Sequence, residues 1–334
     1  MSKLRTINLK KLQTGIGLGC LFVVLALQAQ TAPLTAGDPI LLPGTTGGFD
    51  FIRMDTAGNR LLLGHEANKT FDVFDIGSKK LLKAVPTGTA QDATADVKRG
   101  NYYVSGNDPG RMVIVDAKTL EVTGEVPMPT NTDLIAFNPV NGLVYECNDT
   151  AGEVWVVDPD AKKIVATIKY DGSGVEDLAF DKDYKHLYQA VKGRNTISVV
   201  DPANNQVVEA WPCAPDKGVH GIALAPDANG VLVACAGKLV LIDLSSGKVV
   251  ATAPIATRVD EMAYDPGLHL AYCAGRAGKI SVVAVEAGKL TALADVPDET
   301  GTGDITVDPA THTVWIATHK GDQCFVQPFT PAAK

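Results

Sequence analysis

In this 334-residue chain, mostly acidic side chains recur at one position of a repeating pattern, at intervals of 40 to 44 residues. The residues at that position are Asp50, Gln91, Asp133, Glu176, His220, Asp260 and Gly303, and the next position adds Asp92, Asp177, Glu261 and Asp304. Carboxylates brought together repel one another unless water, a cation or a cationic ligand lies between them. Oxygen ligands suit a divalent cation such as Ca²⁺. The candidate metal ligands are Asp133, Glu176, His220, Asp260 and Asp304.

Three histidines could add acid-base or transition-metal chemistry to these acids. His65 and His319 each lie six residues before a matching phenylalanine, and His220 belongs to the acidic position itself. The candidate catalytic residues are His65, His220, His319, Glu176 and Asp260. Basic residues in neighbouring loops could hold an anionic substrate, namely Lys192, Arg194, Arg276 and Lys320. The candidate ligand-binding residues are Asp50, Asp133, Glu176, His220, Asp260, Arg194 and Arg276.

An internal repeat supplies the elements that must position these residues. Its clearest copy runs from Gly152 to Ile168, where two alternating apolar runs flank an Asp-Pro turn. The residue that ends the first run is Asp75, Asp116, Asp158, Asp201, Asp243 and then Ala284, at spacings of 41, 42, 43, 42 and 41 residues. Alternation with a period of two predicts strands, and a repeat of about forty residues predicts β-propeller blades.

We therefore predict an all-β fold, a seven-bladed β-propeller of four-stranded antiparallel blades that forms one domain over residues 37–330. Six blades are complete, beginning near Phe51, Ala93, Leu134, Leu178, Ile222 and Met262. The seventh begins near Ile305 and leaves no room for a fourth strand before Lys334. The early segment Ile40–Leu42 is predicted to supply that strand, because ring closure removes the open sheet edges.

In such a ring, the loop before each inner strand and the hairpin between the second and third strands open on one face, around the central channel. The acids and the three histidines are expected to meet there. Three interpretations remain open from the residues alone: a solvated acidic funnel, a site for an ion or ligand, and a catalytic centre. Close approach of His65, His220 and His319, with a carboxylate bonded to one imidazole, would favour catalysis.

The repeats resemble the YVTN family of propeller repeats, and the chain after its amino end resembles the YncE-like periplasmic propellers. The residues that carry the resemblance are EVWVVDPDAKKIVATI at 153–168, TISVVDPANNQVV at 196–208, GIALAPDANG at 221–230 and LVLIDLSSGKVVAT at 239–252. The resemblance implies the propeller fold and little about function, because the family includes binding proteins, cell-surface repeats and relatives of amine dehydrogenase propeller subunits. It also implies proline at the start of each inner strand, where this chain is mostly acidic.

The amino end has the pattern of a secretory signal peptide over residues 1–29, with basic residues, an apolar run and then small residues. Its removal takes away four basic residues and leaves 26 basic against 38 acidic residues, a net charge of −12. A protein with this negative charge is not expected to bind nucleic acid, because binding to phosphates depends on Lys and Arg. We expect a periplasmic or secreted protein with no membrane span after cleavage, and a monomer.

Five cysteines remain after the signal, and no pair has metal-site spacing. Cys147, Cys235 and Cys273 share one place in the repeat and are predicted to be small buried residues. Whether Cys213 and Cys324 pair is left open.

The sequence thus favours a binding or scaffold protein that engages a small ligand, a cation or a protein partner on its acidic loop face. The alternative is a propeller lactonase, hydrolase or lyase that uses the histidines and acids at the channel mouth. A third reading, a redox-partner subunit, has no cofactor-attachment motif behind it.

Overall fold

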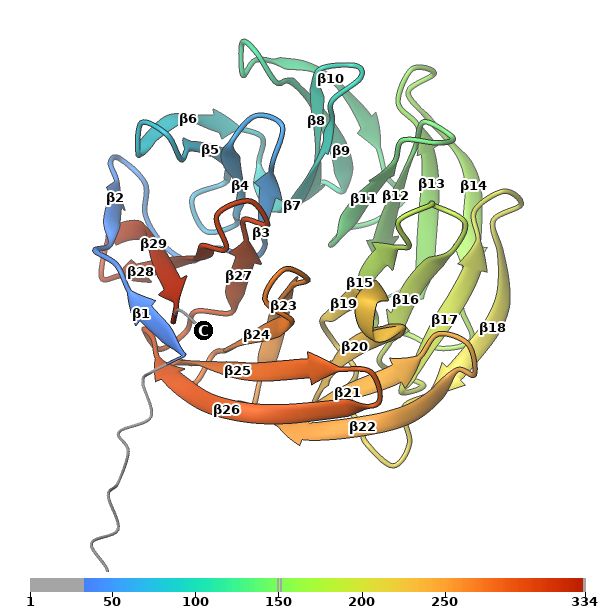
Figure 1. Ribbon diagram of the computed structural model, residues 1–334. Helices are drawn as coiled ribbons and strands as arrows, with labels where there is room; N and C mark the ends of the chain where they lie inside the picture. The colour runs from blue at the N-terminus through green and yellow to red at the C-terminus, as the bar shows by residue number, and fades with distance from the viewer. Residues whose placement is uncertain (1–32, 149, 151, 333–334) are drawn as a thin grey trace, which may run out of the picture. The chain divides into compact units, whose positions relative to one another are not determined.

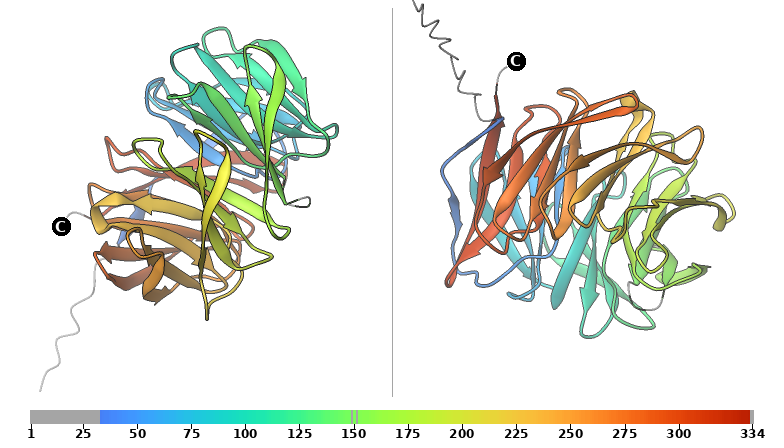
Figure 2. Two further views of the ribbon diagram at one scale, coloured as in Figure 1. Left: turned by 90° about the vertical axis from the view of Figure 1, so that its right-hand side faces the viewer. Right: turned by 90° about the horizontal axis from the view of Figure 1, so that it is seen from below.

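Strands with alternating apolar residues pair in chain order into seven antiparallel sheets, which surround a common centre (Figure 1). The computed structural model describes residues 33–148, 150 and 152–332. Figure 2 shows the same sheets from two sides, standing beside one another. The predicted seven-bladed propeller with four-stranded antiparallel blades is confirmed.

Each blade takes its strands consecutively from the chain. Blade one holds β3 (Ile52–Asp55), β4 (Arg60–His65), β5 (Thr70–Asp75) and β6 (Lys80–Pro86). Blade two holds β7 (Thr89–Asp96), β8 (Asn101–Asn107), β9 (Arg111–Asp116) and β10 (Val122–Pro127). Blade three holds β11 (Ile135–Asn138), β12 (Leu143–Asn148), β13 (Glu153–Asp158) and β14 (Lys163–Lys169). Blade four holds β15 (Val175–Phe180), β16 (Leu187–Val191), β17 (Thr196–Asp201) and β18 (Gln206–Pro212).

The remaining blades follow the same order. Blade five holds β19 (Ile222–Ala225), β20 (Gly230–Cys235), β21 (Lys238–Asp243) and β22 (Lys248–Pro254), with a short 3-10 turn η1 (Pro226–Ala228) between its first two strands. Blade six holds β23 (Val259–Asp265), β24 (Leu270–Gly275), β25 (Lys279–Glu286) and β26 (Lys289–Pro297). Blade seven begins with β27 (Asp304–Val307), β28 (Val314–Lys320) and β29 (Gln323–Pro331).

Blade seven is completed from the other end of the chain. The predicted segment β2 (Ile40–Leu42) pairs with β29, with Ile40 opposite Val326. A second strand that we did not predict, β1 (Leu34–Ala36), pairs farther along β29, with Leu34 opposite Pro331. These blue strands lie beside the red β29 in Figure 1. The ring closes because two short segments together cover the edge of one long strand.

The role of strand β2 in closing the ring can be tested directly, because its two neighbouring leucines differ in burial. Leu42 is 1% exposed and packs beside Cys324, whereas Leu41 is 45% exposed. We expect Leu42→Ala to lower the free energy of unfolding by about 2–5 kcal/mol, and Leu41→Ala by no more than about 0.5 kcal/mol. Urea unfolding of both variants measures this. Equal losses would mean that β2 does not seal the ring.

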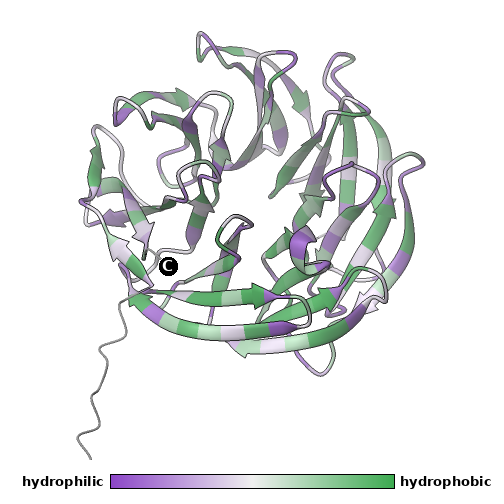
Figure 3. Ribbon diagram, viewed as in Figure 1, coloured by the Kyte–Doolittle hydropathy of each residue, from purple (hydrophilic) through white to green (hydrophobic). Residues whose placement is uncertain are grey.

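The core lies between neighbouring blades and not in one central mass. Apolar residues, green in Figure 3, follow the strands, while the loops are mostly hydrophilic. One buried cluster joins Tyr103 and Met112 of blade two to Ile135 and Trp155 of blade three, and other clusters join the other neighbours. The inner ends of the strands are therefore held firmly, which gives the loops before them defined positions.

At the end of β4, one glycine lets two blades approach each other very closely. A Cβ atom on Gly64 would lie 1.8 Å from the carbonyl oxygen of Gln91, and that oxygen accepts a hydrogen bond from the backbone N–H of Phe51 at 3.1 Å. Only glycine leaves room for this contact. It sets the position of Gln91 and Asp92 relative to blade one.

The cysteines in the described part of the chain are all buried and unbridged. The prediction of burial for Cys147, Cys235 and Cys273 is confirmed. Cys213 and Cys324 lie in different core clusters, so they do not form the pair that the sequence left open.

The predicted signal segment, residues 1–29, lies outside the described residues. Within the described part of the chain, no helix has the length and apolar character needed to cross a membrane.

Candidate functional site

Bulges at the start of alternate inner strands aim consecutive side chains in different directions. In β7, β15 and β23, the pairing shifts register between Ala90 and Ala93, between Val175 and Leu178, and between Val259 and Met262. Two residues on each bulged strand are thus left without a partner in the ladder. These pairs are Gln91-Asp92, Glu176-Asp177 and Asp260-Glu261. The first member of each lines a cavity at the loop face, while the second turns toward the centre of the ring.

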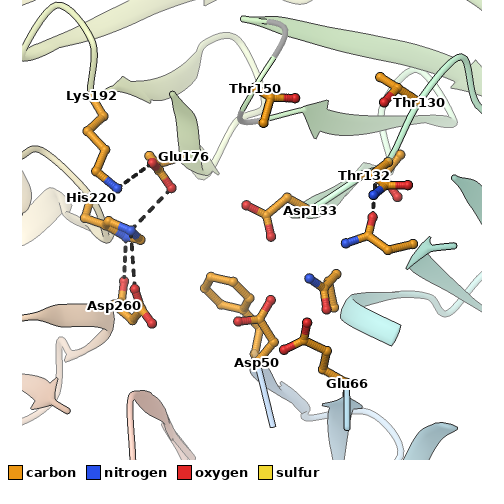
Figure 4. Close-up of a pocket in the computed structure, with 14 residues that line it drawn as sticks. Asp50, Glu66, Thr130, Thr132, Asp133, Thr150, Glu176, Lys192, His220 and Asp260 are labelled. Atoms are coloured by element: carbon orange, nitrogen blue, oxygen red, sulfur yellow. Dashed lines mark hydrogen bonds and ion pairs between the residues drawn. The ribbon is translucent and has the colours of Figure 1, made fainter. Parts of the chain in front are cut away.

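The cavity has a volume of about 400 Å³ and collects residues from six blades. Five carboxylates line it, those of Asp50, Glu66, Asp133, Glu176 and Asp260. Lys192 and His220 are the basic groups among its lining residues. In Figure 4, Asp50, Glu66 and Asp133 point into one space, opposite the wall formed by Glu176, His220 and Asp260. The predicted convergence of the acidic position on one face is therefore observed for these residues.

His220 connects two carboxylates along one wall of the cavity (Figure 4). Its Nε2 lies 3.3 Å from Oε2 of Glu176 and 3.3 Å from Oδ1 of Asp260. Its Nδ1 lies 3.2 Å from the backbone oxygen of Asp260. Lys192 continues the chain of charges, with Nζ 2.9 Å from Oε1 of Glu176. Both ring nitrogens of His220 therefore face acceptor oxygens.

The opposite wall is poor in positive charge. Burial, together with the charges of Glu66 and Asp260, raises the pKa of Asp50 to about 8, although the Arg276 guanidinium lies 3.8 Å from its Oδ1. Arg276 mainly pairs with Asp260. Burial is the largest cause of the raised pKa of Asp50, and the nearby carboxylates of Glu66 and Asp260 add to it.

Gln91 adds an unsatisfied acceptor to the cavity. Its side chain lines the cavity, the residue is only 8% exposed, and its Oε1 accepts no hydrogen bond from the part of the chain that the structure describes. Buried amide oxygens in folded proteins nearly always have a donor. The missing donor is one that a ligand bearing N–H groups can provide.

Below the cavity, Arg53 of β3 binds the second members of the three bulges. Its Nε lies 2.9 Å from Asp92 Oδ1, its Nη1 2.8 Å from Glu261 Oε1 and its Nη2 3.6 Å from Asp177 Oδ1. Each carboxylate also accepts a backbone N–H of the following blade: Asp92 from Ile135, Asp177 from Ile222 and Glu261 from Ile305. These three acids therefore clamp neighbouring blades around one guanidinium and do not face a ligand.

Arg53 is not among the residues predicted from the sequence, although its position carries a signal. The matching residues of the other six inner strands are all small: Thr94, Ala136, Ala179, Ala223, Ala263 and Thr306. An arginine among small residues that face a narrow channel is the group able to fill that space. The buried acids Asp92, Asp177 and Glu261 need a positive charge nearby, and Arg53 is the one basic residue on the described inner strands.

The histidines do not gather as predicted, because two of them lie away from the cavity. His65 is fully buried, with Nδ1 2.8 Å from Asp72 Oδ2 and Nε2 3.6 Å from Cys324 Sγ, and its ring stacks on Phe49. His319 is exposed at the end of β28 and contacts the carbonyl oxygen of Gly321. Neither lines the cavity that holds His220. The alternation of side chains along β4 turns His65 into the interface between blades one and seven.

Two further predicted site residues also lie elsewhere. Arg194 pairs with the exposed Asp171 and does not line the cavity. Asp304 is 3% exposed, and burial, followed by the charges of Glu261 and Asp50, raises its pKa well above the usual value. A carboxyl that favours the protonated form in this way is a poor ligand for a metal ion.

The candidate metal ligands Asp133, Glu176, His220 and Asp260 do share the cavity. Across residues 33–148, 150 and 152–332, however, no group of three or more His, Cys, Asp or Glu side chains is arranged to hold a metal ion. The carboxylates are instead spread around the wall. Such a distribution suits a ligand larger than a single ion.

Comparison with known proteins agrees with the fold. Residues 86–275 match the sequence model of a family described as a domain of unknown function, DUF5074. Two curated relatives are both described as uncharacterized protein YncE. The one from Salmonella typhimurium is 25% identical over 155 residues, 46% of this chain. The one from Salmonella typhi is 26% identical over 201 residues, 58% of this chain. The matched segments span 38% and 55% of those relatives.

Solved structures resemble this chain in fold alone, since their sequence identities are low. Hydrazine synthase of Kuenenia stuttgartiensis aligns with a TM-score of 0.73 at 16% identity, over 87% of this chain and 96% of that chain. A chain of the mitotic checkpoint complex aligns with a TM-score of 0.74 at 13% identity, over 98% of both chains. The RRP9 WD40 repeats align with a TM-score of 0.73 at 10% identity, over 89% of this chain and 98% of that chain.

Proposed function

We propose a function from the cavity itself, because the chain belongs to the DUF5074 family and the description of that family names no function. The curated relatives of the chain are YncE proteins. We propose that this protein is a binding protein whose loop-face cavity takes the cationic group of a small organic ligand. The observation that carries the proposal is the gathering of five carboxylates around one cavity, against the two basic lining groups Lys192 and His220.

An organic ammonium group fits this cavity better than a bare ion does. An ammonium donates several hydrogen bonds and needs no fixed set of ligands, so acceptors spread around a wall can share it. Asp50, Glu66 and Asp133 point toward a common space that can receive it (Figure 4), and Gln91 supplies a neutral acceptor. The cavity walls lower the local dielectric constant, which strengthens the attraction between carboxylates and a cation.

The proposal predicts measurable binding of hexylammonium, a simple cationic probe. We expect isothermal titration calorimetry to detect binding to the protein, and Glu66→Gln to weaken it about 10-fold, or about 1.4 kcal/mol. Glu66 is exposed and forms no ion pair with the described residues, so its replacement should leave the fold intact. The matched control is Asp183→Asn, which removes one exposed carboxylate from a turn outside the cavity. Equal affinity in the wild type and Glu66→Gln would contradict the proposal.

A second prediction concerns protons released on binding. With a pKa of about 8, Asp50 is mostly protonated at pH 7, and a bound cation lowers that pKa and expels the proton. We expect hexylammonium to release up to about one proton at pH 7, and its affinity to increase as the pH rises toward 9. Titrations in buffers of different ionisation enthalpy measure the release. Asp50→Asn should abolish it, and release that persists in this variant would assign the proton to another group.

Ca²⁺ alone is the necessary comparison, because a divalent cation was the candidate cofactor from the sequence. Saturable binding of Ca²⁺ that displaces hexylammonium would make the cavity an ion site and would replace the organic ligand in the proposal. Failure of Ca²⁺ to compete leaves the ammonium proposal standing.

His220 supports one alternative, a hydrolase or lyase, since an imidazole between two carboxylates lines the cavity. Two features favour binding over this alternative. Both ring nitrogens already face acceptors, and the described residues lining the cavity include no serine or cysteine. Hydrolysis of a lactone panel above the buffer rate, lost in His220→Asn, would establish catalysis instead.

We also propose that the protein works as a monomer in the periplasm or outside the cell, after loss of residues 1–29. The basic, apolar and small-residue order of that segment supports the proposal. Amino-terminal sequencing of the protein purified from its native compartment tests the cleavage, and light scattering tests the oligomeric state.

A further inference from the structure

A second cavity lies beside the acidic one and shares part of its wall. It has a volume of about 360 Å³, and Lys192, His220 and Asp260 line both cavities. Its remaining charged residues are basic, Arg258 and Arg276. Among the described residues, Asp260 is the only carboxylate that lines it, and Asp260 is already bonded to Arg276 and lies beside His220. The acidic cavity is thus adjoined by one with surplus positive charge.

Arg258 supplies that surplus. Its side chain is exposed and forms no hydrogen bond or ion pair with any residue of the described ranges. Its backbone is in the left-handed region, with φ of 59°, which is uncommon for a residue other than glycine. The carbonyl oxygen of Arg258 accepts a hydrogen bond from the backbone N–H of Arg276 at 3.2 Å, so the segment before β23 and the hairpin after β24 hold the two arginines side by side. A guanidinium in this situation is suited to bind a carboxylate with two parallel hydrogen bonds.

We propose that the two cavities together bind one dipolar ligand, which places an ammonium group among Asp50, Glu66 and Asp133 and a carboxylate against Arg258 and Arg276. This inference rests on the proposed function, since it assigns the ligand of the same site. The shared wall of Lys192, His220 and Asp260 lies between the two ends. Opposite charges in neighbouring cavities also orient the ligand, because reversing it would bring each end against groups of its own sign.

The shared wall also sets the length of the ligand. An α-amino acid carries its two charges close together, so it could bridge Asp50 and Arg276, whose guanidinium lies 3.8 Å from Asp50 Oδ1, but would leave Arg258 without a carboxylate. An ω-amino acid of several carbons, or a short peptide with free ends, has its charges far enough apart. The class of ligand is therefore a linear zwitterion with separated charges.

The test compares four probes by calorimetry: 6-aminohexanoate, hexylammonium, hexanoate and glycine. We expect 6-aminohexanoate to bind at least about 10-fold more tightly than hexylammonium, which corresponds to one carboxylate–arginine contact. Hexanoate and glycine should bind more weakly than either. In Arg258→Gln, the affinity for 6-aminohexanoate should fall to that for hexylammonium, while hexylammonium itself binds as before. Arg194→Gln, an arginine outside both cavities, is the matched control and should change nothing.

The outcomes separate the two proposals. If hexylammonium binds but 6-aminohexanoate binds no better, the dipolar ligand is ruled out and the cationic site remains. If only hexanoate binds, the proposed function itself is overturned. If 6-aminohexanoate binds more tightly and Arg258→Gln has no effect, the carboxylate is held elsewhere and the assignment of the second cavity is wrong.

Discussion

Arg53→Met is expected to destabilise the propeller by about 3–5 kcal/mol at pH 8, the typical cost of leaving buried charges without their partner. The substitution removes the guanidinium that contacts Asp92, Asp177 and Glu261, three carboxylates that are each at most 3% exposed. Those carboxylates also hold the next blades through backbone N–H groups, so several blades should loosen together.

The loss of stability caused by Arg53→Met should become smaller as the pH falls. Burial already raises the pKa of Asp177 and Glu261 in the presence of Arg53, and removing the positive charge raises both further. A carboxyl with a raised folded-state pKa binds protons more readily when folded, so the variant should become relatively more stable on acidification and less stable as the pH rises.

Urea unfolding of Arg53→Met and the wild type at pH 5 and pH 8 measures both effects. Arg194→Met is the matched control, since its partner Asp171 is exposed, and it should cost less than about 1 kcal/mol at either pH. A loss of the same size at pH 5 and pH 8 would show that Arg53 acts through packing and not through charge.

His65→Gln is expected to produce the second large effect, with the opposite dependence on pH. Burial alone would lower the pKa of His65, but hydrogen bonds with Asp72 and Cys324 outweigh it and raise the pKa to about 9. A raised histidine pKa contributes stability that is complete below the unfolded pKa of about 6.5 and is lost as the pH rises through about 9. The difference amounts to about 3 kcal/mol.

The stability difference between the wild type and His65→Gln should therefore be largest near pH 6 and smallest near pH 10. Thermal and urea unfolding across that range measure it. His319→Gln changes an exposed imidazole in the same part of the ring and should show no such dependence. A difference that stays constant from pH 6 to pH 10 would mean that His65 is buried in its neutral form.

Much of the fold could be predicted because it depends on the order of apolar and turn-forming residues over short stretches of the chain. Alternation of apolar residues marked the strands, the spacing near forty residues marked the blades, and the missing last strand pointed to Ile40–Leu42. The strand β1 was missed because Leu34–Ala36 has little alternation, and its pairing depends on how far β29 extends.

The acidic position was also visible in the sequence, but the roles of its members were not. Glu176 and Asp177 are neighbours in the chain, yet the bulge in β15 sends one into the cavity and the other to the Arg53 clamp. A bulge is a feature of pairing with another strand, so the composition of one segment does not reveal it.

The sequence by itself determined the repeat, the number of blades, the closure of the ring and the recurrence of acids near its axis, because each of these follows from periodicity along the chain. Only the tertiary structure decided which acids line the cavity, that Arg53 neutralises three others, and that His65 is buried while His220 lines the cavity. The physical reason is that charge balance and burial depend on neighbours from other blades, which lie about forty or more residues away in the chain.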